Sequence, residues 1–292
     1  MLDNSRTRAI TIFTLLTLIW GTSFILIKQG LKVFSPDEVG ALRVASAALF
    51  LLPLAVVRLK GLQPNHYWKL FASGMLGIFI PAFLFATAQT RMESSIVGIM
   101  NTLTPIFTVI LSAILFKQRF KNTAILGLIL GFGGTILLSL SKSGGTVTGF
   151  NAFALLIVVA CFCYASNINF VKFKIPDLNA LTITSVSVML IGPLAVIYLF
   201  GFTDFTTKLA THEGATEALG YIIILGLMST AVATILFNWL VKISTPLFTS
   251  SVTYAIPIVA VMWGVADGER LAIGHLIGMA AIITGVYLAN KK

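Results

Sequence analysis

The sequence predicts an all-α membrane protein with ten transmembrane helices in two inverted five-helix repeats. Three observations lead to this prediction: the composition, ten long apolar segments, and matching residues in the two halves. Of the 292 residues, 57% are hydrophobic and 10% are charged, whereas a soluble domain carries roughly 25% charged residues. So few charges suit a chain surrounded by lipid. The apolar segments are also too long and too uniform for the alternating strands of a β-barrel.

Ten segments are apolar over the roughly 20 residues that a membrane helix needs. The first follows Arg6 and Arg8 and lacks a small-residue cleavage site, so we expect it to be retained as a helix. The segments cover residues 9–28, 39–57, 68–90, 94–116, 122–140, 150–171, 179–200, 217–240, 246–266 and 271–289.

The breaks between these segments are polar and short, and none is long enough for a soluble domain. Each carries charges, proline or glycine. In order, they fall at residues 29–38, 58–67, 91–93, 117–121, 141–149, 172–178, 201–216, 241–245 and 267–270.

Basic residues are distributed unequally between the two sides of the predicted bundle. With ten spans, both termini lie on one side, and the loops of that side hold 13 Lys and Arg residues against six on the other. Cytoplasmic loops of membrane proteins carry such an excess, so both termini are predicted to be cytoplasmic. The net charge of +10 is spread between the apolar segments, which argues against a nucleic-acid partner.

Residues of the first half recur in the second half at nearly constant spacing. Pro36–Asp37 and Pro176–Asp177 are 140 positions apart, and Phe85 and Phe237 are 152 apart. We therefore expect two repeats, residues 1–145 and 146–292. Because five spans is an odd number, the second repeat must enter the membrane from the opposite side. Inverted repeats are typical of secondary transporters with a substrate site at the midplane; a receptor or scaffold is the alternative.

Several short motifs in this order resemble the paired EamA domains of the drug/metabolite transporter superfamily. They are Trp20-Gly21-Thr22-Ser23-Phe24, Ala41-Leu42-Arg43, Leu103-Thr104-Pro105-Ile106-Phe107 and Gly268-Glu269-Arg270-Leu271. The resemblance covers nearly the whole chain. It implies a five-plus-five helical fold, a bacterial inner-membrane location, and export of amino acids or related metabolites. Glu269 has Gln118 as its counterpart in the first half, a departure from a symmetric pattern.

Matched polar and aromatic residues predict a cavity between the repeats. Trp20 and Thr22 in the first segment correspond to Tyr164 and Ser166 in the sixth. Polar residues inside membrane helices mark candidate sites, although hydroxyls also hydrogen-bond neighbouring helices without any further role.

Two prolines predict interrupted helices at corresponding places. The fourth segment contains Asn101 and Pro105, and the ninth contains Thr253, Tyr254 and Pro257. A proline removes one backbone hydrogen bond and kinks a helix. Interrupted helices in corresponding positions of two repeats indicate a transport site, although proline is also common in membrane helices.

The remaining candidates are Phe85 in the third segment, Asn238 and Trp239 in the eighth, and Arg43 in the second. A buried amide such as Asn238 should face a partner or a cavity. Arg43 either binds a carboxylate or phosphate, which a guanidinium matches with two parallel hydrogen bonds, or it extends to the membrane surface or pairs with Glu38 or Glu93 there. The full predicted set is Trp20, Thr22, Arg43, Phe85, Asn101, Pro105, Tyr164, Ser166, Asn238, Trp239, Thr253, Tyr254 and Pro257.

The predicted function is transport of a small amphipathic metabolite, such as an amino acid or nucleobase-like compound, by alternating access. A multidrug exporter is the alternative, although lipophilic cations favour a buried acid, which the segments lack. No enzyme motif is present, and no cofactor or metal site is expected. The G-x-x-x-G patterns at Gly127–Gly131 and Gly274–Gly278 indicate helix packing, within the chain or in a homodimer.

Overall fold

The computed structural model describes residues 2–92, 94–142, 152–266 and 273–289, and these parts of the chain are helical with no strand. Glu93, Glu269 and Arg270 lie outside the described residues, as does the predicted boundary between the repeats. Within the described residues, each of the ten apolar segments is mainly helical. The protein is therefore an all-α protein of the predicted class.

The helices of the first half are α1 (Leu2–Gly30), α2 (Pro36–Arg58), α3 (Pro64–Gly74), the π-helix η1 (Met75–Phe79), α4 (Ile80–Gln89), α5 (Ser94–Met100), the 3-10 helix η2 (Asn101–Leu103), α6 (Thr104–Phe116) and α7 (Asn122–Lys142). Those of the second half are α8 (Ala154–Lys174), α9 (Ala180–Phe202), α10 (Phe205–Thr211), α11 (Ala215–Ile224), the π-helix η3 (Leu225–Val232), α12 (Ala233–Ile243), α13 (Pro246–Ser250), α14 (Val252–Ala266) and α15 (Ile273–Ala289).

Seven of these helical runs are long and apolar enough to cross a membrane. The fifth, ninth and tenth segments supply shorter apolar helices within the described residues. The chain is therefore a multi-pass membrane protein, while the count of ten spans stays a prediction.

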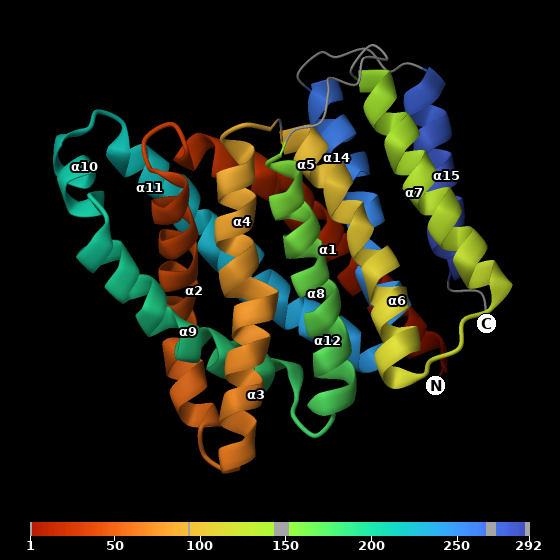
Figure 1. Cartoon of the computed structure of the whole chain (residues 1–292), viewed down its shortest axis with the longest axis horizontal. Coiled ribbons are helices and arrows are strands. Elements are labelled where there is room, and N and C mark those ends of the chain that lie inside the picture. Colours follow the sequence, from red (N-terminus) through yellow and green to blue (C-terminus); the bar gives the residue numbers. More distant parts are fainter. Residues whose placement is uncertain (1, 93, 143–151, 267–272, 290–292) are drawn as a thin grey trace.

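The two halves run in opposite directions through the bundle (Figure 1). Helix α1 begins at the end of the bundle where α15 finishes, which we call the termini end. Helix α8, the first of the second half, begins at the opposite end and runs toward the termini end. The described ends of the chain thus lie on one side, as an inverted repeat requires.

Contacts between the halves occur in matching pairs. Helix α2 packs against α9, its own counterpart, and α7 packs against α15. Helix α1 packs against α12 and α14, and its counterpart α8 packs against α4 and α6. This pattern is what a two-fold relation between the repeats produces.

Glycines bring α7 and α15 into backbone contact. A methyl carbon added at Gly127 would lie 2.5 Å from the Gly285 carbonyl oxygen, and one added at Gly134 would lie 2.8 Å from that of Gly278. Small residues allow such close approach between membrane helices. The glycine face of α7 is therefore used for packing within the chain.

Two clusters of buried apolar residues join the repeats at the two ends of the bundle. The termini-end cluster includes Leu16 of α1 and Leu240 of α12. The opposite-end cluster includes Ala160 of α8 and Ala88 of α4, which correspond to Leu16 and Leu240 in the repeat alignment. Each cluster is made by helices of both halves.

Gly127→Ala should destabilise the protein, whereas Gly133→Ala on the same helix should not. The added methyl group at Gly127 would meet backbone atoms of Gly285 and Ala289, which cannot rotate away, and such overpacking costs about 1–3 kcal/mol. At Gly133 it would meet nothing within 4 Å, and alanine has the higher helix propensity. Thermal unfolding in detergent measures both variants. Equal midpoints would contradict the packing of α7 against α15.

Candidate functional site

A cavity lies between the two repeats, near the middle of the helical runs. The space open to the centre of a water molecule is about 70 Å³, enough for on the order of five waters at ~10–15 Å³ each. Helices α1, α4, α6, α8, α12, α13 and α14 line it, with η1, η2, η3 and one residue of α2. These include all six of the spans that the sequence predicts to surround the cavity.

Most of the lining consists of pairs that correspond in the repeat alignment. Examples from the two halves are Phe24 with Ile168, and Thr104 with Ile256. The cavity therefore lies on the axis that relates the repeats.

Two aromatic pairs follow the same symmetry. Trp20 of α1 lies against Phe237 of α12, with 5.1 Å between ring centroids. Its counterpart Tyr164 of α8 lies against Phe85 of α4, at 5.9 Å. Each pair joins one repeat to the other, and all four rings line the cavity.

The cavity faces two π-helical turns at corresponding positions. Gly77 of η1 and Ser229 of η3 are 152 positions apart and both line it. The indole Nε1 of Trp20 donates a hydrogen bond of 3.0 Å to the Ser229 carbonyl. At Gly77 an added methyl carbon would lie within van der Waals overlap of the Asn167 amide. Such turns occur often at functional sites.

The backbone is irregular before both prolines, next to the cavity, although α14 itself runs through Pro257 without a break. Helix α6 is preceded by the 3-10 turn η2, and α13 is separated from α14 at Ser251. Pro105 and Pro257 lack an N–H. The carbonyl four residues earlier therefore has no backbone donor within the helix. Those earlier residues are Asn101 and Thr253, and both line the cavity. The prolines themselves are buried beside it.

Arg43 reaches the cavity from α2. Its Nε donates a hydrogen bond of 2.6 Å to the hydroxyl of Thr230 in η3, so one charged side chain links the two repeats. Neither acid considered from the sequence pairs with it in the described structure. Glu93 lies outside the described residues, and Glu38 has other partners.

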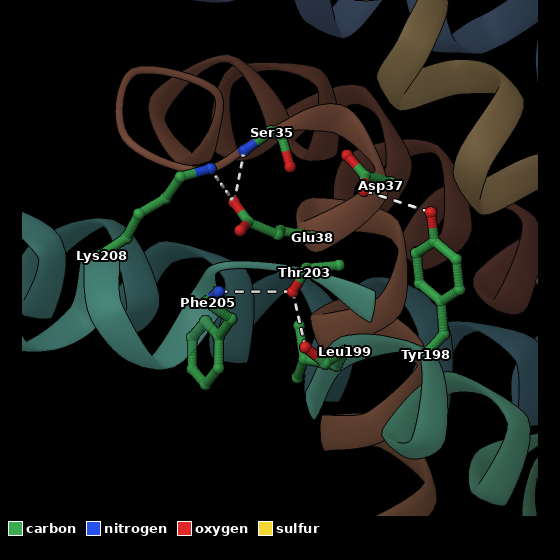
Figure 2. A network of polar contacts seen from close by, with 8 residues as sticks. All are labelled: Ser35, Asp37, Glu38, Tyr198, Leu199, Thr203, Phe205 and Lys208. Carbon is green, nitrogen blue, oxygen red and sulfur yellow. Dashed lines mark hydrogen bonds and ion pairs between the residues drawn. The ribbon is translucent and has the colours of Figure 1, made fainter. Parts of the chain in front are cut away.

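Figure 2 shows the acids at the start of α2 and their partners. A Glu38 carboxylate oxygen accepts hydrogen bonds from the Ser35 amide, at 2.7 Å, and from the Lys208 ammonium of α10, at 2.8 Å. Asp37 accepts one from the Tyr198 hydroxyl of α9. These acids hold α9 and α10 against α2 and do not neutralise the arginine in the cavity.

Three predicted residues face away from the cavity. Thr22 donates to the Leu18 carbonyl of its own helix, Ser166 is not among the lining residues, and Trp239 is 43% exposed on the outer surface. Residues two positions apart on a helix point about 200° apart. Since Trp20, Tyr164 and Phe237 point inward, their neighbours two positions later point outward.

Two further predicted residues hold the fold beside the cavity. The Asn238 amide donates to the Thr184 hydroxyl of α9 at 2.9 Å, so it faces a partner helix. Tyr254 is fully buried, and its hydroxyl donates to the Leu128 carbonyl of α7 at 3.3 Å. Its ring lies 3.0 Å from where a methyl carbon at Gly131 would stand.

The sequence prediction missed several lining residues, among them Asn167, Ser229 and Thr230. Asn167 accepts a hydrogen bond of 2.8 Å from Ser73 of α3. The polar pair Ser229–Thr230 inside an apolar segment, and the spacing of Asn167 three residues after Tyr164, are the signals that would have found them.

Comparisons with known proteins place the chain in a family. A family model described as the EamA-like transporter family matches residues 7–140 and 151–291. An uncharacterized transporter of Archaeoglobus fulgidus is 25% identical over 94% of this chain and 95% of its own. The uncharacterized inner membrane transporter YedA of Escherichia coli K12 is 24% identical over 95% and 91%.

A solved protein crystal structure shares the fold, with a TM-score of 0.75 over 97% of this chain and 96% of the other, at 18% identity. The family match covers nearly the whole sequence in two consecutive copies, in agreement with the symmetry of the cavity. The chain belongs to the EamA-like transporter family.

Proposed function

We propose that this protein is a secondary transporter that carries a small amphipathic metabolite, such as an amino acid or nucleobase-like compound, by alternating access. The observation that carries the proposal is the cavity on the axis between the repeats, lined by corresponding residues of both. Family membership supports transport in general. Transport moves the substrate without changing its covalent bonds, so no catalytic residue is required.

The two apolar clusters supply the closures that alternating access needs. The termini-end cluster joins α1 to α12, and the opposite-end cluster joins α8 to α4. Rocking of one repeat against the other would open either cluster while its counterpart stays packed. Trp20 packs against the termini-end cluster and Tyr164 packs against the opposite-end cluster, and both side chains also line the cavity. They therefore lie where the clusters meet the cavity.

The side chains that line the cavity favour binding of metabolites over binding of lipophilic cations. Its side chains are aromatic, aliphatic, hydroxyl and amide groups, and among the described residues no Asp or Glu lines the cavity. A cationic drug would have no counter-charge there and would meet Arg43. Export, which the family resemblance implies, stays a prediction.

Counterflow in proteoliposomes tests the proposal. Vesicles preloaded with unlabelled amino acids or nucleobases should accumulate external tracer of the same class through the protein. Repeating the assay with and without a pH gradient shows whether protons are coupled. A protein that accumulates no compound of either class would contradict the proposed substrates.

Trp20→Ala should reduce counterflow by about tenfold or more, while Trp239→Ala should leave it nearly unchanged. The first change removes an aromatic wall of the cavity and a hydrogen bond to η3, and such a loss of binding and positioning is worth over about 1.4 kcal/mol. Trp239→Ala also removes an indole, but from the outer surface of the bundle. Equal losses in the two variants would show that the cavity is not the transport site.

We further propose that the protein resides in the cytoplasmic membrane of a bacterium with both termini inside. The excess of basic residues in the termini-end loops supports the orientation, and the name of YedA supports the membrane. Cysteines placed at exposed Lys60 and His212 lie on opposite sides of the bundle. A membrane-impermeant maleimide should label His212→Cys in intact cells and Lys60→Cys only after lysis; the reverse would invert the topology.

A further inference from the structure

We propose that Arg43 binds a carboxylate of the transported substrate, which makes this protein selective for compounds with one negative charge and an apolar body. The inference rests on the proposed function, because it assigns a substrate class to the same cavity. It starts from a positive charge within the helical bundle that has no acidic partner among the described residues.

The guanidinium of Arg43 is only partly used by the protein. Of its five N–H groups, the one on Nε donates to Thr230. The structure gives the others no partner among the described residues, and Arg43 forms no ion pair with any described acid. An ionised side chain away from water is costly unless it is paired. An anion that enters the cavity would supply the missing partner.

The nearest acid along α2 cannot take that place. Glu38 lies five residues before Arg43, which on a helix is a rotation of about 140°. Glu38 is instead held by its ion pair with Lys208 of α10 and by its bond to the Ser35 amide, both drawn in Figure 2. The charge of Arg43, which is half-buried, is thus left for the cavity.

Thr230 fixes how the guanidinium is presented. The hydrogen bond from Nε to the Thr230 hydroxyl, at 2.6 Å, holds one edge of the planar group. The Nη atoms are the ones left over, and two parallel N–H groups match the two oxygens of a carboxylate. A lysine would keep the charge without this planar arrangement.

The rest of the lining limits the substrate to a single charge. Arg43 is the only Lys or Arg that lines the cavity within the described chain, and no acid lines it. A dianion would leave one charge without a partner, and a cation would leave two positive charges together. The aromatic pairs of Trp20 with Phe237 and of Phe85 with Tyr164 suit an apolar body. Monocarboxylates carry this chemistry, and α-amino acids share the carboxylate but add an ammonium group that no acid of the described lining would pair.

Binding to the purified full-length protein in detergent tests the inference with four probes that share a phenyl group. They are 3-phenylpropionate, phenylalanine, 3-phenylpropanamide and phenethylamine, and ligand-induced thermal stabilisation gives their relative affinities. At least one carboxylate probe should bind about tenfold or more tightly than the amide and the amine, as expected for a charged hydrogen bond. Tighter binding of 3-phenylpropionate would indicate a plain carboxylate as substrate, and tighter binding of phenylalanine would indicate an amino acid.

Two substitutions of Arg43 and one control on the same helix assign the selectivity. Arg43→Gln should abolish the preference for the carboxylate, and Arg43→Lys should restore it only in part. Arg58→Gln removes the same charge at the end of α2, away from the cavity, and should keep the preference. If Arg43→Gln does not fold, the wild-type comparison of carboxylate with amide still decides.

The inference is overturned if the amide or amine binds as tightly as both carboxylates, if none of the probes binds, or if Arg43→Gln keeps the preference. Because binding is measured without transport, its outcome is separate from that of the proposed function. Selective binding without counterflow would refute transport and leave the carboxylate site intact. Counterflow of neutral compounds alone would support transport and refute the carboxylate site.

Discussion

The hydrocarbon of a membrane offers no hydrogen bonds, and this constraint governs where the backbone of this protein departs from a regular α-helix. Irregular backbone at membrane depth is tolerated only where protein or a cavity satisfies it. Here the departures are the two π-helices, the 3-10 turn η2 and the break between α13 and α14. Each contributes to, or adjoins, residues that line the cavity between the repeats. The Ser229 carbonyl in η3 meets the Trp20 indole, so irregular backbone and aromatic wall support each other.

The helices and their symmetry could be predicted from the sequence because both depend on patterns along the chain. Apolar length sets the spans, and recurring residues such as Phe85 and Phe237 mark the repeats. The aromatic contact of Trp20 with Phe237 is mirrored by that of Tyr164 with Phe85, the residues that the alignment matches to the first pair. The irregular turn before Pro105 was also foreseen, because a missing N–H acts locally, whereas α14 continues through Pro257 and its separation from α13 lies earlier, at Ser251.

The side of each helix that faces the cavity could not be predicted from the sequence as accurately as the helices themselves. In a soluble helix the polar side faces water and the apolar side faces the core, but a membrane helix is apolar on both sides. Thr22, Ser166 and Trp239 were therefore placed in the cavity, although the helix turns them outward. The π-helices shift this register further, because each inserts an extra residue in a turn. No sequence pattern around Gly77 or Ser229 indicates this change of helical register.

The two apolar clusters of this symmetric protein differ in side-chain size at one matched pair of positions. Where the termini end packs Leu16 against Leu240, the opposite end has Ala160 and Ala88. Each leucine buries three more carbon atoms than alanine, worth about 2 kcal/mol when the alternative is contact with water. In a carrier that rocks between two states, this one pair of positions would favour a closed termini end by that amount.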